Sequence, residues 1–408
     1  MKSLQGARDK RVKITADEKL IIDRLLLPEE TTRTTLAKNL GVSPAWVTKI
    51  VTPLVTRGIV TETGTAKKSG GRRARTLGIS KDVGYLLGVD FGAMSLDISL
   101  ASPNIEPLAE EHVSIKISDG PEVCLGKFFN VTDELLDANG LERSQIRGIG
   151  VGVPGPVDFV RGFLTSPPIM PGWDNYPIPG ELMASFSEAV VVVDNDVNMM
   201  ALGELRRGDG QHVPNLIFLK LGSGISAGIV CEGEVYRGSS GSAGDVGHIV
   251  VERDGPLCRC GNRGCLEALA GGIAIAAEAS RLAVTGESPI LSEIYRSSKK
   301  VLTAVDVGAA AAQGDLAALA LVDRSGHYVG EMLTHLVSFF NPDLILIGGG
   351  VSKIGHRFLN TIRQVVLQKA SPLSTRDLSI KYSDLGERAG IVGALSLAQE
   401  TLFSSQRG

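Results

Sequence analysis

Three of the chain's five cysteines lie within eight residues, as Cys258, Cys260 and Cys265, and His248 precedes the first of them by ten positions. Three thiolates and one imidazole form a complete tetrahedral ligand set for a structural zinc ion. Glycines between the sulfurs allow the backbone to turn tightly around a metal. The alternative, a chance cluster of reduced cysteines, is disfavoured by the tight spacing. The sequence therefore predicts one zinc ion per chain, bound by these four residues.

Two acidic residues flank this cluster. Asp245 lies three residues before His248, and Glu267 lies two residues after Cys265. A metal that holds His248 in place would also fix the positions of these two carboxylates. Fixed carboxylates beside an imidazole suit a polyhydroxylated ligand, because each oxygen can accept a hydrogen bond from a hydroxyl group.

The same stretch carries a family resemblance. Gly-x-x-Gly-His followed by Cys-x-Cys-Gly-x-x-Gly-Cys-x-Glu resembles the zinc signature of the ROK family, which groups sugar kinases with sugar-responsive transcriptional repressors. The resemblance implies that His248 binds zinc through one ring nitrogen and faces a sugar with the other. It also implies that Asp245 and Glu267 accept sugar hydroxyls. Family members usually carry Glu at the position of Asp245, and the shorter side chain leaves the identity of the sugar open.

Composition places the chain among soluble globular proteins. With 408 residues, 43% hydrophobic and 21% charged, it is long enough for two or three domains. No run approaches 18 consecutive apolar residues, and the charged N-terminus does not resemble a signal peptide. Cys124 and Cys231 remain as free thiols outside the cluster. We therefore expect a cytoplasmic protein without membrane contact.

The N-terminal part of the chain is basic. Residues 1–80 hold 16 Lys/Arg against 7 Asp/Glu, although the whole chain has a net charge of −3. Apolar spacing predicts helices over 14–27, 33–40 and 45–57, with Thr15 as the N-cap of the first, a glycine turn at Gly41 and a Ser-Pro start before the last helix. This order is that of a helix-turn-helix, whose third helix would enter the DNA major groove.

Two short strands, 59–63 and 75–79, flank a basic Lys-Lys-Ser-Gly-Gly-Arg-Arg tip and read as a wing that would meet phosphates or a minor groove. A protein-interaction or dimerisation module is the alternative, which the basic charge disfavours. Trp46 either packs into the core or contacts a thymine methyl group. The expected DNA-binding residues are Ser43, Ala45, Trp46, Thr48, Lys49, Arg72 and Arg73. This head resembles the winged-helix head of ROK repressors, which implies a palindromic operator and a homodimer or homotetramer.

The next segment, from 83 to 100, has a hairpin pattern that includes Asp90 and Gly92. It resembles the first phosphate loop of the sugar-kinase, actin and Hsp70 superfamily, Asp-x-Gly-Gly-Thr. Here Ala93 and Met94 replace the second glycine and the threonine, so a Cβ obstructs the backbone and a phosphate-binding hydroxyl is lost. We therefore expect no ATP binding and no enzymatic activity, although weaker matches to a second phosphate loop (222–228) and an adenosine motif (341–350) follow.

Polar residues end two apolar segments that read as buried strands. One segment runs into Pro154 and Gly155, and the other into Asn195 and Asp196, which is where α/β sheets bind ligands. By family resemblance, Asp196 stands at the general-base position of the kinases, here as a vestige, and Asn195 orients the sugar. A merely polar strand-end turn is the alternative interpretation. The expected sugar-binding residues are Gly155, Asn195, Asp196, Asp245, His248 and Glu267.

These patterns predict an α/β protein with an N-terminal winged helix-turn-helix and a two-lobed sugar-kinase/actin/Hsp70-like body carrying a zinc knuckle. The expected domains are the head at 1–80, a first lobe at 81–200 completed by 388–408, and a second lobe with the zinc site and an oligomerisation surface at 201–387. The expected function is a sugar-responsive DNA-binding repressor of carbohydrate genes, with the inducer between the lobes. The alternatives are a sugar kinase with a fused DNA-binding head and an adapter controlled by a protein partner.

Overall fold

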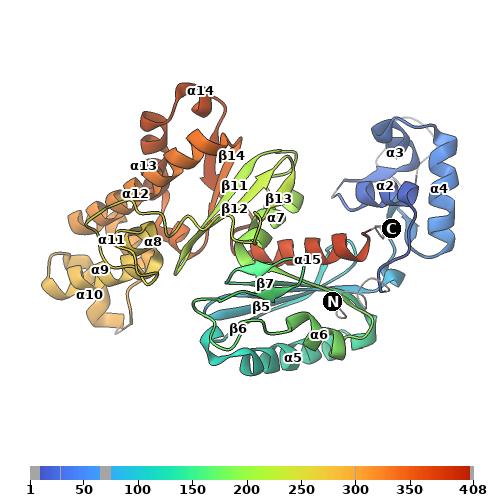
Figure 1. Ribbon diagram of the computed structural model, residues 1–408, viewed down its shortest axis with the longest axis horizontal. Helices are drawn as coiled ribbons and strands as arrows, with labels where there is room; N and C mark the ends of the chain where they lie inside the picture. Colours follow the sequence, from blue (N-terminus) through green and yellow to red (C-terminus); the bar gives the residue numbers. More distant parts are fainter. Residues whose placement is uncertain (1–9, 28, 65–74, 299, 405–408) are drawn as a thin grey trace. The chain divides into compact units, whose positions relative to one another are not determined.

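A computed structural model describes residues 10–27, 29–64, 75–298 and 300–404 (Figure 1). The chain forms two compact units, of which the first comprises Met1–Met199 and Gly390–Gly408 and the second comprises Met200–Ala389. The second unit is therefore an insertion in the first, and the chain passes between them after Met199 and again after Ala389.

In the described part of the head of the first unit, three helices accompany a small sheet in the strand order β1-β3-β2. Its elements are α2 (Ala16–Leu25), β1 (Thr31–Thr32), α3 (Arg33–Leu40), α4 (Pro44–Thr56), β2 (Val60–Thr63) and β3 (Thr76–Ile79). The predicted starts of two helices are confirmed. The Glu18 amide donates to the Thr15 hydroxyl, and the Trp46 amide donates to that of Ser43 at 3.1 Å.

The head shares its apolar core with the lobe that follows it. Ile21 and Leu54 from the head belong to one buried cluster with Leu86 and Leu395 from the lobe. Polar contacts reinforce this packing. The Asn104 side chain bonds both backbone groups of Ile79, at 2.9 and 3.2 Å, and the Val12 amide donates to the Leu402 carbonyl at 3.0 Å.

The lobe of the first unit is built on a five-stranded sheet in the order β10-β7-β4-β5-β6, with β10, β7 and β4 parallel. Figure 1 shows α5 and α6 covering one face of the sheet and α15 lying on the other. The strands are β4 (Tyr85–Phe91), β5 (Ser95–Ala101), β6 (Pro107–Ser114), β7 (Ile146–Val153) and β10 (Val190–Asn195), with a separate pair β8 (Val157–Asp158) and β9 (Phe163–Leu164). The helices are α5 (Pro121–Ala138), α6 (Ile178–Ser185), the first turn of α7 (Asp196–Arg207) and α15 (Ala389–Leu402).

Glycines on one face of β7 allow α15 to approach the sheet with its backbone. Gly148 and Gly150 are two residues apart and so point to the same face. A Cβ atom on Gly150 would lie 1.9 Å from the carbonyl oxygen of Ala394 in α15, and one on Gly148 would lie 3.2 Å from that of Ala398. Helix α15 therefore packs closely only because these positions lack side chains.

The second unit has its own five-stranded sheet, in the order β13-β12-β11-β14-β15, and a separate helical core. The strands are β11 (Leu216–Leu221), β12 (Ile225–Cys231), β13 (Glu234–Tyr236), β14 (Leu344–Gly348) and β15 (Ser379–Tyr382). The helices are α8 (Leu266–Ala270), α9 (Gly272–Thr285), α10 (Pro289–Ser298), α11 (Ala304–Ala312), α12 (Leu316–Phe340), α13 (His356–Lys369) and α14 (Pro372–Thr375). Short 3₁₀ turns, η1 to η5, occur at Lys81–Val83, Ile117–Asp119, Arg143–Gln145, Gly350–Ile354 and Gly386–Arg388.

One stretch of the described chain, Leu266–Thr285, is long and apolar enough to cross a membrane by length and composition alone. It contains α8 and α9, which are separated by Gly271 in an extended conformation. Leu266, Ile275 and Leu282 from this stretch are buried in the core of the second unit. The stretch is thus accounted for as a pair of core helices.

Glu204, near the end of α7, is a fully buried carboxylate that joins two segments of the second unit. It accepts a hydrogen bond from the Asp209 amide at 2.9 Å and another from the hydroxyl of Ser383, the residue that follows β15. Burial raises the pKa of Glu204, although the hydrogen bonds from Ser383 and Asp209 partly oppose this effect. The folded protein therefore favours the protonated carboxyl more than the unfolded chain does.

We expect this raised pKa to appear as a pH-dependent difference between the parent protein and Glu204→Gln. Above the ordinary pKa of a glutamate, the native parent binds more protons than the unfolded chain, so its stability falls as the pH rises through the raised value. The glutamine variant lacks this titration. Its unfolding free energy relative to the parent, measured by denaturant titration, should therefore rise as the pH is increased above the ordinary pKa of a glutamate. A difference that stays constant or falls over that range would contradict the expectation.

Candidate metal and sugar site

The four predicted metal ligands lie together in the second unit. Their ligand atoms are all within 4.8 Å of one another. Cys260 Sγ lies 3.6 Å from Cys265 Sγ, and Cys258 Sγ lies 3.7 Å from His248 Nδ1. A tetrahedron with ordinary zinc–sulfur and zinc–nitrogen bonds has edges of about 3.5 to 3.8 Å. The 3.6 and 3.7 Å separations therefore fit a four-coordinate metal ion, and the remaining ligand atoms lie near enough to complete the set.

The ionisation of the thiols also fits a metal. Burial, followed by the neighbouring sulfurs of Cys260 and Cys258, raises the pKa of Cys265 to about 12. The Cys265 thiol would therefore ionise far more readily with a cation beside it. A divalent ion would supply that charge and deprotonate its ligands. Because Nδ1 of His248 faces the sulfurs, the other ring nitrogen remains for a ligand or a hydrogen bond.

The backbone around the cysteines forms a compact knuckle. The Cys258 amide donates to the Asn262 carbonyl at 2.7 Å, and the Gly264 amide donates to that of Pro256 at 2.8 Å. Gly264 has a φ of 69°, and a Cβ at this position would overlap the Glu252 carbonyl. The loop between the sulfurs is thus held by its own hydrogen bonds.

The histidine and Glu267 are tied together by the backbone on either side of them. The Leu266 amide donates to the Ile249 carbonyl, and the Glu267 amide donates to the Gly247 carbonyl, both at 2.9 Å. These two bonds place the first turn of α8 beside the His248 segment. The predicted sugar ligands His248 and Glu267 therefore lie on adjacent, mutually bonded segments.

The segment before His248 is seated on β12. A Cβ on Gly244 would overlap the Ala227 carbonyl, and one on Gly247 would overlap the Ile225 carbonyl, so only glycine permits this approach. Asp245 lies between these glycines with its side chain exposed. The structure thus brings Asp245 to the start of β12, in the same unit as His248 and Glu267.

Glu267 has a partner that the sequence analysis did not identify. Its Oε1 lies 2.8 Å from Nε of Arg259, and its Oε2 accepts a hydrogen bond from the Ile225 amide at 3.1 Å. Arg259 stands between two of the metal ligands, and its spacing in the sequence indicates nothing about where its side chain points. The only signal in the sequence was the presence of an arginine, with its long, positively charged side chain, inside the knuckle.

In the first unit, the structure brings Gly155 together with Asn195. Asn195 Nδ2 donates to the Gly155 carbonyl at 2.9 Å, because β7 and β10 are parallel neighbours that end at the same edge. Asp196 begins α7 with 3% exposure, and its Oδ1 accepts from the Val197 amide at 2.7 Å. Buried Asp194, which is not among the predicted sugar-binding residues, accepts hydrogen bonds from the Asn195 amide and the Asn198 side chain.

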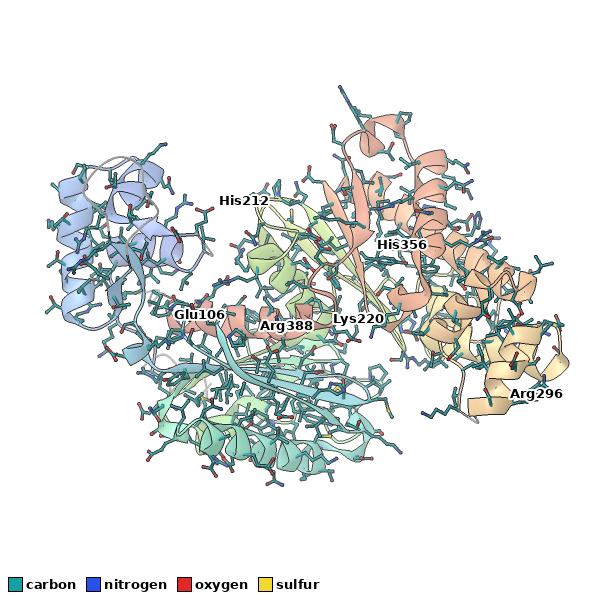
Figure 2. All side chains as sticks on the ribbon, turned by 180° about the vertical axis from the view of Figure 1, so that it is seen from behind. Glu106, His212, Lys220, Arg296, His356 and Arg388 are labelled. Atoms are coloured by element: carbon teal, nitrogen blue, oxygen red, sulfur yellow. The ribbon has the colours of Figure 1, made fainter. Side chains whose placement is uncertain are left out.

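The turn that resembles a phosphate loop connects β4 to β5. Met94 is 63% exposed at its tip, and the carbonyl groups of Ala93 and Met94 accept hydrogen bonds from Ile117 and Ile115. The tip therefore presents a thioether where the kinase pattern has a hydroxyl. In the second unit, the segment that resembles the adenosine motif contains β14 and the turn after it, where Gly349 has a φ of 88°. His356, labelled in Figure 2, begins α13 a few residues further on. Its ring centroid lies 6.0 Å from that of Tyr382.

The predicted DNA-binding residues of α4 fall into two groups. Ser43, Ala45, Thr48 and Lys49 are exposed along the start of the helix. Trp46 is half-buried and packs against the core of the head, which favours the first of its two interpretations. Arg72 and Arg73 lie outside the described residues.

A scan against known families matches the ROK family model over residues 86–401. The chain belongs to the ROK family. The match covers the sheet of the first unit, α15 and the whole second unit. The predicted fold class is confirmed, since a solved structure of a ROK family transcriptional regulator, a homologue of the E. coli MLC protein, superposes with a TM-score of 0.79 at 26% identity, covering 95% of this chain and 97% of that one.

ROK relatives of two kinds resemble the chain. The xylose repressor of Caldicellulosiruptor bescii is 30% identical over 387 residues, covering 94% of this chain and 96% of the repressor. The glucokinase of Halalkalibacterium halodurans is 32% identical over 325 residues, covering 79% of this chain and 98% of the kinase. The repressor therefore matches nearly the full length of this chain, and the kinase leaves about a fifth of it unmatched.

Proposed function

We infer that this ROK protein is a sugar-responsive transcriptional repressor that binds DNA through its head. The observation that carries the inference is that one chain combines an exposed face of α4 on its head with the metal and sugar residues of the body. Relatives that are regulators match over nearly the whole length, head included. The expected partners are a double-stranded, palindromic operator and a sugar or sugar derivative.

The finer assignments belong to the same proposal. Residues 1–80 bind DNA, residues 81–200 with 388–408 form the first sugar-binding lobe, and residues 201–387 carry the metal and an oligomerisation surface. The metal is zinc, and the protein is a cytoplasmic homodimer or homotetramer. The sugar-binding residues are Gly155, Asn195 and Asp196 in the first unit, and Asp245, His248 and Glu267 in the second.

We also propose that the protein is not an enzyme. Ala93 replaces the glycine, and the exposed Met94 replaces the hydroxyl-bearing threonine, on which phosphate positioning depends. A sugar kinase is the second candidate, because glucokinases are among the relatives and Asp196 stands at the general-base position. Sugar-dependent ATP turnover at kinase rates of roughly 1 per second or faster would favour that candidate.

Regulation follows from linkage between two binding sites. If the sugar and the operator favour different arrangements of the protein, each changes the affinity of the other by the same factor. The buried cluster and the hydrogen bonds that join the head to the first lobe supply a physical connection inside the first unit. A typical coupling of about 1 to 3 kcal/mol corresponds to a change of roughly 5- to 150-fold in operator affinity.

Two variants test this function from opposite ends. Asp196→Asn keeps the side chain's size but removes the charge that a sugar hydroxyl meets, so the sugar should lose its effect on operator binding while sugar-free operator affinity stays the same. Lys49→Ala removes one exposed charge from α4. It should weaken operator binding and reduce the slope of log affinity against log salt by about one unit. Lys127→Ala, which removes the same charge from α5, is the control and should change neither the operator affinity nor its salt slope.

The measurements are operator binding by fluorescence anisotropy at several salt concentrations, with and without a sugar identified by thermal-shift screening. A parent-like sugar response in Asp196→Asn would remove that residue from the sugar site. A salt slope unchanged by Lys49→Ala would contradict the DNA-binding role of this face of α4. A parent protein whose DNA binding answers to a protein partner and to no sugar would favour the adapter instead.

A further inference from the structure

Arg259 combines a fixed backbone with an accessible charged group. It lies between Cys258 and Cys260, so its main chain is part of the metal knuckle. Its side chain extends to the carboxylate of Glu267, and its Nε lies 2.8 Å from Oε1 of that residue. The Arg259 side chain is 41% exposed, and that of Glu267 is 10% exposed. The side chain is therefore anchored through Nε, and a large part of it remains accessible to solvent.

The turn between β11 and β12 completes this arrangement. The Ile225 amide bonds the second oxygen of Glu267, so the carboxylate is held from both sides. A Cβ on Gly224 would lie 2.9 Å from Nη2 of Arg259 and would overlap Oε2 of Glu267. A side chain at position 224 would displace the two charged groups from these positions. Three segments, namely the knuckle, the turn and the first turn of α8, thus converge on one ion pair.

The chemistry of this pair suits adjacent hydroxyl groups. A sugar hydroxyl is both a donor and an acceptor, a carboxylate only accepts, and a guanidinium only donates. Arg259 uses Nε on Glu267, which leaves four N–H groups on the planar end of the side chain. A carboxylate and a guanidinium fixed side by side therefore offer an acceptor and a donor at neighbouring points.

We propose that Arg259 is a sugar-binding residue that acts together with Glu267 on two adjacent hydroxyl groups of the effector. One hydroxyl donates to the Glu267 carboxylate, and the oxygen of its neighbour accepts from the Arg259 guanidinium. The ligand class is a sugar with at least one free vicinal diol. This inference rests on the proposed function, since it assigns a residue and a ligand feature to the same sugar site.

The knuckle contains a matched control. Arg263 is exposed and lies in the same knuckle, between Cys260 and Cys265, but its Nη1 is directed to the Gly255 carbonyl at 3.5 Å. Replacing it with alanine removes the same charge and side-chain length from the same loop. A general effect of charge or of knuckle folding should appear in Arg263→Ala, whereas a specific effect at Glu267 should not.

The experiment titrates the full-length, metal-loaded protein with a sugar by calorimetry. The probe is whichever of D-xylose, D-glucose and N-acetyl-D-glucosamine binds the parent most tightly. Arg259→Ala should weaken binding by about ten- to a hundredfold, the range for one or two hydrogen bonds from a charged donor. Arg259→Lys should recover part of the loss, and Arg263→Ala should stay within about twofold of the parent. Metal content by mass spectrometry should stay at the parent level in all three variants.

Monodeoxy analogues of the same sugar locate the contact. For the parent, at least one analogue should bind much more weakly than the full sugar. For Arg259→Ala, the same analogue and the full sugar should bind equally well, because the contact that the missing hydroxyl makes has already been lost. If Arg259→Ala loses its metal, the same comparison is made in Arg259→Lys. The proposal would be overturned if, for every analogue, the loss of binding free energy from removing the hydroxyl were the same in the parent and in the variant.

Binding by Arg259→Ala that equals or exceeds that of the parent would also overturn it, because the arginine would then be neutral or a competitor for Glu267. In that case a parent protein whose operator binding responds to the sugar would leave the proposed function intact. A parent that binds none of the three probes and shows no sugar effect on DNA would instead remove the proposed function together with this inference.

Discussion

Cys265→Ser is expected to abolish metal binding and the sugar response together, while the first unit stays folded. The structure supports this outcome because Cys265 is buried, is one of four converging ligands, and immediately precedes the turn of α8 that carries Glu267. Structural zinc sites in small peptides contribute about 10 to 16 kcal/mol of apparent binding free energy. Without the ion, the knuckle loses the interaction that gathers its sulfurs, and His248 and Glu267 lose their fixed positions.

The measurement is metal content by mass spectrometry, combined with sugar binding and thermal unfolding before and after treatment with a chelator. Cys231→Ser is the matched control, since Cys231 is exposed at the end of β12, outside the group of four ligands. It should keep the metal and the sugar response. A Cys265→Ser protein that retains one metal ion per chain, or that binds sugar like the parent, would show that the ligand assignment is wrong.

Gly150→Ala is expected to destabilise the first unit by about 3 kcal/mol or more, at the upper end of the costs of overpacking a core. The added Cβ would lie 1.9 Å from the Ala394 carbonyl oxygen, so α15 must move away from the sheet. The neighbour is helix backbone, which cannot rotate aside as a flexible side chain can. Because Leu395 of α15 also belongs to the core of the head, the shift should loosen the head as well.

Gly126→Ala provides the opposite expectation within the same lobe. Gly126 lies in the interior of α5, and among the described residues no atom beyond its own stretch of helix lies within 4 Å of its Cβ position. Alanine should therefore stabilise the helix by about 0.5 to 1 kcal/mol through its higher helix propensity. Denaturant unfolding of both variants measures the contrast. Equal effects of the two substitutions would contradict the close packing of α15 on β7.

Local patterns allowed the metal ligands and the helix starts to be predicted from the sequence. The ligands of the knuckle lie close together in the chain, and tight turns bring such residues together almost regardless of the rest of the fold. The same holds for Thr15 and Ser43, whose hydroxyls cap helices that begin one residue later. The pairing of Gly155 with Asn195 could be anticipated in outline, since both follow buried strands.

Long-range packing and side-chain direction could not be predicted in this way. Nothing in the spacing Cys-x-Cys indicates that the side chain of Arg259 turns from the metal towards Glu267. The role of Gly150 depends on a helix more than two hundred residues further along the chain. Strand β1, only two residues long, was missed because Thr31 and Thr32 have no alternating pattern of their own and pair with β3 through tertiary packing.

The insertion of the second unit has a consequence for biosynthesis. A ribosome must complete the entire stretch Met200–Ala389 before it makes α15, the helix that covers the glycine-lined face of the first sheet. During that interval the nascent head and first sheet exist without their last layer, while the cysteine knuckle has already emerged and can take up its ion. A chaperone that binds the nascent chain should therefore contact the early strands β4 and β7. The knuckle should take up its metal ion before the DNA-binding end of the protein reaches its final fold.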